Sequence, residues 1–157
     1  VPSTSFNNTQ FTADSMMPSY LLAGQADIDS LVAAPWLSGD NNSIHDWVTG
    51  AQKMNGLDVT FTPNDHASFL AACSSYDESG RHPDVYSWTK TIDGVDVPLV
   101  QWALCLLRPH NCYPSDMPVL WDFMEHFSFV KGSDGSLTRY YSPSAFANND
   151  AVTITKG

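Results

Sequence analysis

Residues 97–107 read Val97-Pro98-Leu99-Val100-Gln101-Trp102-Ala103-Leu104-Cys105-Leu106-Leu107, a segment that is almost continuously apolar in its second half. Such a run is typical of a strand that is covered on both faces, because neither face meets water. The dipeptide Asp93-Gly94 precedes this segment, and it is typical of the two-residue turn of a β-hairpin. The sequence therefore predicts a buried strand over 97–107 that pairs with a strand over 85–90.

The elements around this hairpin predict an α/β fold. A short apolar strand is expected over 19–23, ended by Gly24, and a helix from Ser43 to Asn55, with Gly56 at its end. A second helix is expected over 116–127, with Ser115 as its N-cap. One apolar stripe on it predicts core packing: Met117, Leu120, Trp121, Met124 and Phe127. The order strand, helix, hairpin, strand, helix predicts one parallel crossover.

The domain organisation follows from the same pattern. Residues 1–17 are rich in Ser, Thr and Asn and predict an irregular lead-in, 18–129 form the α/β domain, and 130–157 predict a polar tail or linker. Only three or four strands are readable, and a doubly wound sheet usually has more. The sequence starts at Val1 rather than at Met, so we expect the sheet to be completed by a portion that is not in this chain.

Composition and charge exclude several classes of partner. The 157 residues carry a formal net charge of −10, which repels nucleic-acid phosphates and anionic membrane surfaces. No apolar run approaches the roughly 20 residues of a membrane helix. Lys and Arg are scarce while Asn, Ser and Thr are abundant, which favours a secreted or extracytoplasmic protein.

The cysteines and histidines predict neither a metal site nor a cofactor. The three cysteines form no C-x-x-C pair, and no two histidines have metal-ligand spacing. Cys105 is expected to be a buried thiol. Cys112 can pair with Cys73 in an oxidising compartment, and the sequence leaves that pairing open.

Two residues have positions typical of catalysis. Asp27 follows the first strand and His110 follows the last, and ligands of open α/β sheets bind at the carboxyl ends of strands. A carboxylate orients an imidazole that takes a proton from a nucleophile, so the pair predicts an orienting acid and a general base. Asp29 is the alternative acid. The structural alternative is that Asp27 caps a turn after the strand and that His110 is hydrogen-bonded to the backbone.

The segment from Met17 to about Phe129 resembles the C-terminal half of polyhydroxybutyrate depolymerase-like and feruloyl esterase-like α/β-hydrolases. Residues 17–27, Met17-Pro18-Ser19-Tyr20-Leu21-Leu22-Ala23-Gly24-Gln25-Ala26-Asp27, are similar to the strand that delivers the family's acid. Residues 97–102 are similar to the strand before its histidine, and His110 with Pro114 resembles its H-x-W-P segment. The resemblance implies a C-terminal half of an α/β-hydrolase sheet, with Asp27 and His110 as triad members.

The chain departs from the family pattern around its histidine. Arg108 and Pro109 stand where the family has glycines, and Tyr113 stands where it has tryptophan. No G-x-S-x-G motif is present, so the nucleophilic serine must come from a missing or separate N-terminal hydrolase segment.

The expected function is therefore that of a serine-type esterase part, inactive alone, acting on feruloyl, acetyl or polyester bonds. The alternative is a non-catalytic binding module on a degenerate hydrolase half. The candidate substrate contacts are Trp36, His66 and Tyr113, and core packing is the alternative for Trp36.

Overall fold

A computed structural model describes residues 16–24, 43–59, 84–105, 108, 112–146 and 148–154. The elements within them are β1 (Ser19–Gly24), α2 (Ser43–Met54), β2 (Asp84–Ile92), β3 (Val95–Cys105), α4 (Asp116–Met124), β4 (Phe127–Lys131), β5 (Leu137–Tyr141), the 3-10 helix η1 (Asn148–Asp150) and β6 (Val152–Ile154). These strands make two sheets of three strands each. The mixture of helices and strands agrees with the predicted α/β class.

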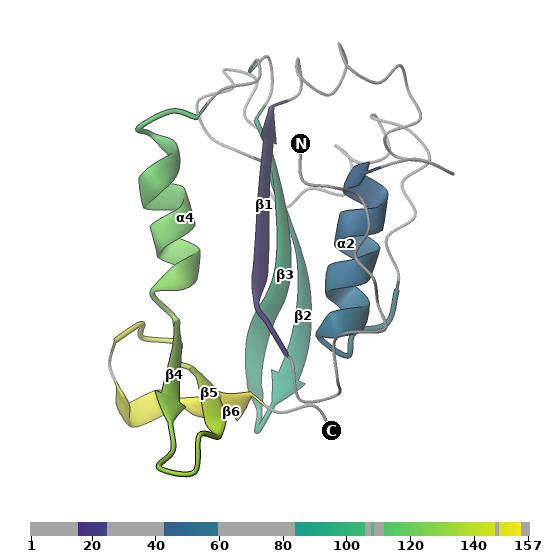
Figure 1. Ribbon diagram of the computed structural model, residues 1–157. Helices are drawn as coiled ribbons and strands as arrows, with labels where there is room; N and C mark the ends of the chain where they lie inside the picture. Colours follow the sequence, from purple (N-terminus) through teal and green to yellow (C-terminus); the bar gives the residue numbers. More distant parts are fainter. Residues whose placement is uncertain are drawn as a thin grey trace.

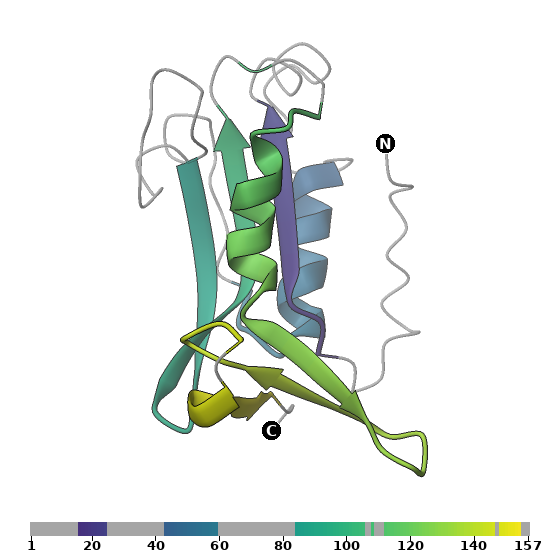
Figure 2. The same cartoon turned by 90° about the vertical axis from the view of Figure 1, so that its left-hand side faces the viewer.

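The first sheet has the strand order β1-β3-β2, with β3 in the centre (Figure 2). β1 runs parallel to β3, with Leu21 opposite Trp102, which confirms the predicted parallel crossover. The successive residues Leu99 and Val100 of β3 are both fully buried, as are Trp102 and Ala103. Because neighbouring residues of a strand point to opposite faces, both faces of β3 are covered, as predicted.

The antiparallel hairpin of β2 and β3 is also confirmed. Asp93 and Gly94 form its turn, and their φ angles are 51° and 81°. Two consecutive positive φ angles define the turn whose twist matches that of paired strands, and Asp-Gly is among the sequences that adopt it readily.

The helices α2 and α4 lie on opposite faces of the first sheet (Figure 1). α2 ends at Met54, one residue before the predicted Asn55, and Gly56 follows it as predicted. Gly56 has a φ of 64° and donates to the Lys53 carbonyl, and Leu57 donates to the Gln52 carbonyl, which is the glycine-terminated arrangement of a Schellman motif. The Asn55 side-chain amide donates to the Met17 carbonyl at 2.8 Å, so this helix end also fixes the chain that enters β1.

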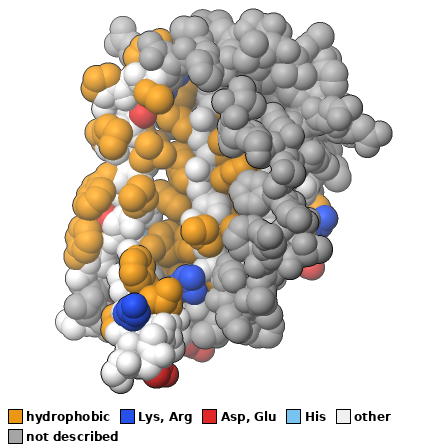
Figure 3. All heavy atoms as spheres, viewed as in Figure 1, with side chains coloured by type: hydrophobic (Ala, Val, Ile, Leu, Met, Phe, Trp, Pro, Cys, Tyr) orange, Lys and Arg blue, Asp and Glu red, His pale blue; other side chains and the backbone are white. Residues whose placement is uncertain are grey.

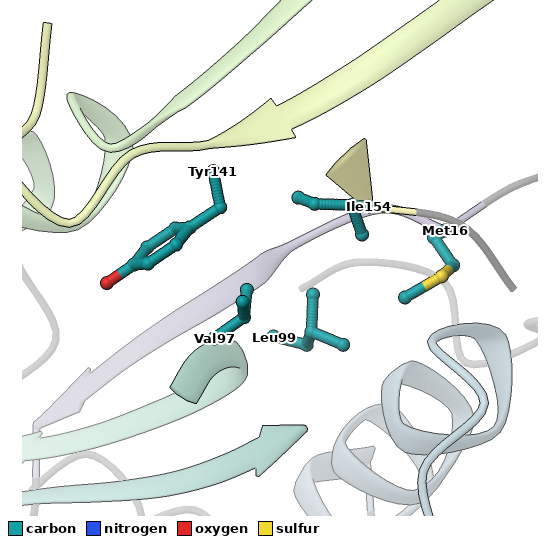
Figure 4. Packing of buried hydrophobic residues seen from close by; sticks show 5 residues of the cluster. All are labelled: Met16, Val97, Leu99, Tyr141 and Ile154. Carbon is teal, nitrogen blue, oxygen red and sulfur yellow. The ribbon is translucent and has the colours of Figure 1, made fainter. Parts of the chain in front are cut away.

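Residues predicted to be a tail or linker form most of the second sheet instead. β4, β5 and β6 pair antiparallel, and Tyr141 and Ile154 are buried against Met16, Val97 and Leu99 (Figure 4). These strands have five, five and three residues, too short for an alternating pattern to stand out. Their burial depends on β3, which is remote in the sequence.

The last helix also differs from its prediction. It ends at Met124 rather than near Phe127, which is the first residue of β4. The predicted core stripe is wrong for three members, because Met117, Trp121 and Met124 are 64%, 52% and 56% exposed. Phe123 is instead the buried apolar residue of α4, and its ring lies 5.2 Å from that of Tyr20 in β1.

Replacing Ile154 by Ala should lower the free energy of unfolding by about 3 kcal/mol, because its side chain fills the core between the two sheets. The matched control is Leu137→Ala in β5, where the exposed side chain predicts a change within about 0.5 kcal/mol. Urea unfolding of both variants measures the difference. Equal stabilities would show that residues 127–154 do not pack against β3.

Candidate functional site

The carboxyl ends of β1 and β3 lie together at one edge of the first sheet, at the top of Figure 1. The two strands are parallel, and their register ends with Gly24 opposite Cys105. The chain segments that leave these two residues therefore start side by side. This is the edge at which open α/β sheets bind their ligands.

Tyr113 is the one predicted site residue among those that the structure describes. Asp27, Trp36, His66 and His110 lie outside the described residues, as does Cys73. Tyr113 is half-buried, and the guanidinium of Arg108 lies over its ring, 4.5 Å from the centroid. Such stacking is a favourable cation–π contact.

Arg108 joins the end of β3 to the start of α4. Its Nη1 atom forms a short ion pair with Asp116 Oδ1 and donates to Cys105 Sγ at 3.2 Å, and its Nη2 donates to Ser115 Oγ at 3.2 Å. The Arg108 and Asp116 side chains are only 11% and 9% exposed, so solvent screens their attraction weakly. Arg108 thus has a clear structural partner in Asp116.

Asp116 organises the turn that begins α4. Its Oδ2 accepts a hydrogen bond from the Tyr113 backbone N–H at 2.9 Å, and its own backbone N–H donates to the Tyr113 carbonyl at 2.9 Å. Ser115 occupies the predicted N-cap position, yet its side chain makes no capping hydrogen bond. Sequence reasoning missed Asp116, although an acid in the first turn of a helix was a usable signal.

Tyr20 lies beneath α4 with its hydroxyl buried. Among the described residues this hydroxyl has no hydrogen-bond partner. Burial raises the pKa of Tyr20 well above its usual value, and electrostatic repulsion from Cys105, Asp116 and Asp122 acts in the same direction. The phenol therefore stays protonated at neutral pH, and we assign it to packing.

A pocket of about 310 Å³ opens between α4 and the β2–β3 side of the sheet. Its polar lining includes Gln101, Asp122 and His126. His126 Nδ1 lies 2.7 Å from the Ser142 carbonyl, so it carries the proton and donates to that oxygen. Tyr113 does not line this pocket, so the pocket is separate from the group around Arg108.

Within the described residues, no three His, Cys, Asp or Glu side chains lie close enough together to hold a metal ion. The helices of the described segments are also too short or too polar to cross a membrane.

Comparison of the chain with protein-family models, with curated proteins and with solved structures gives no match.

Replacing Asp116 by Asn should lower the free energy of unfolding by about 3 kcal/mol, because it leaves the Arg108 charge buried without its partner. Asp122→Asn, which removes an exposed carboxylate from the same helix, is the matched control and should stay within about 0.5 kcal/mol. Urea unfolding at neutral pH compares the two variants. If both lose the same stability, the ion pair does not hold β3 to α4.

Proposed function

We propose that this chain is the acid- and histidine-bearing part of a serine-type carboxylic ester hydrolase with an α/β-hydrolase fold. The observation that carries the proposal is the parallel pairing of β1 with β3, in which Gly24 lies opposite Cys105. The two strands that precede Asp27 and His110 therefore end side by side.

Chain length permits the two residues to meet. Asp27 is the third residue after Gly24, and His110 is the fifth after Cys105. An extended chain spans at most about 3.6 Å per residue, so their α-carbons lie within roughly 11 Å and 18 Å of the ends of neighbouring strands. The order of acid before histidine is also that of the α/β-hydrolases.

The contacts of Arg108 support this assignment of His110. Arg108 and Tyr113 stand on either side of His110 in the sequence, and their side chains stack on each other. Both also bind the carboxylate of Asp116, which is buried. Each end of the short segment that contains His110 is thereby held to the first turn of α4.

In the proposed reaction, His110 takes the proton of a serine hydroxyl as the serine oxygen attacks the ester carbonyl, and Asp27 stabilises the imidazolium. His110 then gives that proton to the leaving alcohol, and an acyl-serine remains. Water, deprotonated by His110, releases the acid and restores the serine. The serine belongs to an N-terminal hydrolase segment outside this chain, so the chain alone is inactive.

The proposed substrates are feruloyl or acetyl esters of plant polysaccharides, or polyesters, and we propose that the enzyme acts outside the cytoplasm. No cofactor enters the reaction. Trp36, His66 and Tyr113 are the proposed substrate contacts.

The test uses the assembly that contains this chain, expressed from its complete gene and purified under native conditions. Asp27→Asn should reduce kcat for methyl ferulate or p-nitrophenyl acetate by about 10⁴-fold, and His110→Ala by at least as much. The matched controls Asp29→Asn and His45→Ala should retain activity. Labelling with a fluorophosphonate identifies the polypeptide segment that carries the serine.

Two results would contradict the proposal. An assembly that neither turns over esters nor takes up the fluorophosphonate would favour the binding-module alternative. Equal activity losses in Asp27→Asn and Asp29→Asn would remove Asp27 as the orienting acid.

A further inference from the structure

We propose that the pocket between α4 and the β2–β3 side of the sheet binds a small organic amine in its ammonium form. The pocket has a volume of about 310 Å³, and sites of this size hold small molecules. It is separate from the group around Arg108. The proposal therefore goes beyond the esterase function and does not depend on it.

The pocket lies beside α4, where the helix leaves part of the sheet uncovered. In Figure 2 α4 lies in front of β1 and β3, and β2 runs to one side of it. Phe123, the buried apolar residue of α4, packs on Tyr20 of β1. Val85 of β2 and Gln101 of β3 line the pocket together with these two rings. A helix and the strands beneath it thus bound the space.

Aromatic rings form much of the wall of this pocket. Four lining residues are aromatic, namely Tyr20, Phe123, His126 and Tyr141. The Phe123 ring lies 5.2 Å from that of Tyr20, and the His126 ring stacks on that of Tyr141 with the centroids 5.6 Å apart. Because each ring is held by another, the wall is formed before a ligand arrives. Such rings attract both apolar groups and cations.

The polar groups of the pocket are mainly hydrogen-bond acceptors. His126 donates through Nδ1 to the Ser142 carbonyl, so Nε2 of the neutral ring is an acceptor. Gln101 donates through Nε2 to Ser87 Oγ at 2.9 Å, which leaves its Oε1 as an acceptor. Asp122 adds a carboxylate. A primary ammonium group has three N–H donors and no acceptor, so it is complementary to these groups.

The charge around the pocket also favours a cation. None of the described lysines and arginines lines it, and the charge of Arg108 is paired with Asp116. In Figure 3 the Lys and Arg side chains that are fully in view lie away from α4, over the second sheet and near α2. The net charge of −10 adds a general attraction for cations. An anionic ligand would instead meet the carboxylate of Asp122 and be repelled.

An organic cation fits this lining better than a bare metal ion. Of the side chains that most often bind metals, the described lining offers Asp122 and His126, and protein metal sites usually supply three or more ligands. Val85, Pro98 and Val119 also line the pocket, and a metal ion would leave them in contact with water. An ammonium group on an aromatic body covers these apolar side chains as it meets the acceptors.

Calorimetric titration of the complete native assembly with phenethylamine tests the proposal. The matched ligands are 2-phenylethanol, which is neutral, and 3-phenylpropionate, which is anionic, and both carry the same ring on the same linker. The amine should bind about tenfold more tightly than the alcohol at neutral pH, because its ammonium group makes a charge-assisted hydrogen bond. The anion should show no binding at concentrations up to about 10 mM.

A photoreactive form of the amine, 4-azidophenethylamine, locates the bound ligand. Mass spectrometry should find the label in peptides that contain residues 98–101 or 119–126, which include most of the pocket lining. Assembly that has been treated with a fluorophosphonate should bind phenethylamine with unchanged affinity, because the pocket is separate from the proposed ester site.

Asp122→Asn should weaken the binding of phenethylamine about tenfold and change that of 2-phenylethanol less than about twofold. Glu125→Gln is the matched control, since it removes the same charge three residues further along the chain and Glu125 does not line the pocket. The control should bind phenethylamine within about twofold of the unaltered protein. Urea midpoints of both variants check that each is folded.

Several outcomes would overturn the amine site. These are the absence of phenethylamine binding at about 10 mM, equal losses of affinity in the two variants, and a photolabel that lies outside the pocket. Competition between the amine and the fluorophosphonate would place the amine at the ester site instead. The esterase proposal would survive the first three outcomes, because its own test measures ester turnover in variants of Asp27 and His110.

Discussion

The parallel pairing of β1 with β3 joins two segments about 80 residues apart, and the other described elements take their positions from it. It gives β3 a neighbour on each side, which lets the most apolar strand lie in the centre of the sheet. α2 and α4 then cover the two faces (Figure 1). The second sheet packs below, where Tyr141 and Ile154 contact Val97 and Leu99. The carboxyl ends of β1 and β3 are left together at the opposite end, away from this core.

The two ends of α4 are held by different kinds of interaction. At its start, the ion pair of Arg108 and Asp116 fixes the helix to the end of β3. At its end, Phe123 and Phe127 pack with their ring centroids 5.0 Å apart, and Phe127 packs on Tyr141 in the second sheet. The charged group lies toward the proposed catalytic edge, and the aromatic group belongs to the packing between the sheets. α4 thereby connects the proposed site to the core.

Local signals in the sequence predicted the elements whose causes are local. The turn at Asp93-Gly94, the glycine end of α2 and the apolar run of β3 each depend on a few neighbouring residues, and each is confirmed. The strands β4 to β6 were missed because the burial of Tyr141 and Ile154 depends on Val97 and Leu99 of β3, a strand that is remote in the sequence. The apolar stripe on α4 was wrongly assigned to the core. A helical period shows that one face of the helix is apolar, but it does not show whether another element covers that face. Of the predicted site, Tyr113 alone falls within the described residues. The ion pair of Arg108 with Asp116 joins the end of β3 to the first turn of α4, and the periodicity of a sequence does not predict contacts between separate elements.

The two-residue turn between β2 and β3 has a kinetic consequence. A hairpin closed by Asp93 and Gly94 brings its strands together over a very short loop, and such hairpins form within about 1–10 μs. β1 must instead close a loop of about 80 residues before it can pair, and the entropy of that closure opposes it. The hairpin therefore forms first, and β1 pairs with the free edge of β3 later. A nascent chain would spend that interval with one edge of its most apolar strand uncovered, and this interval is when the protein is most exposed to misassembly.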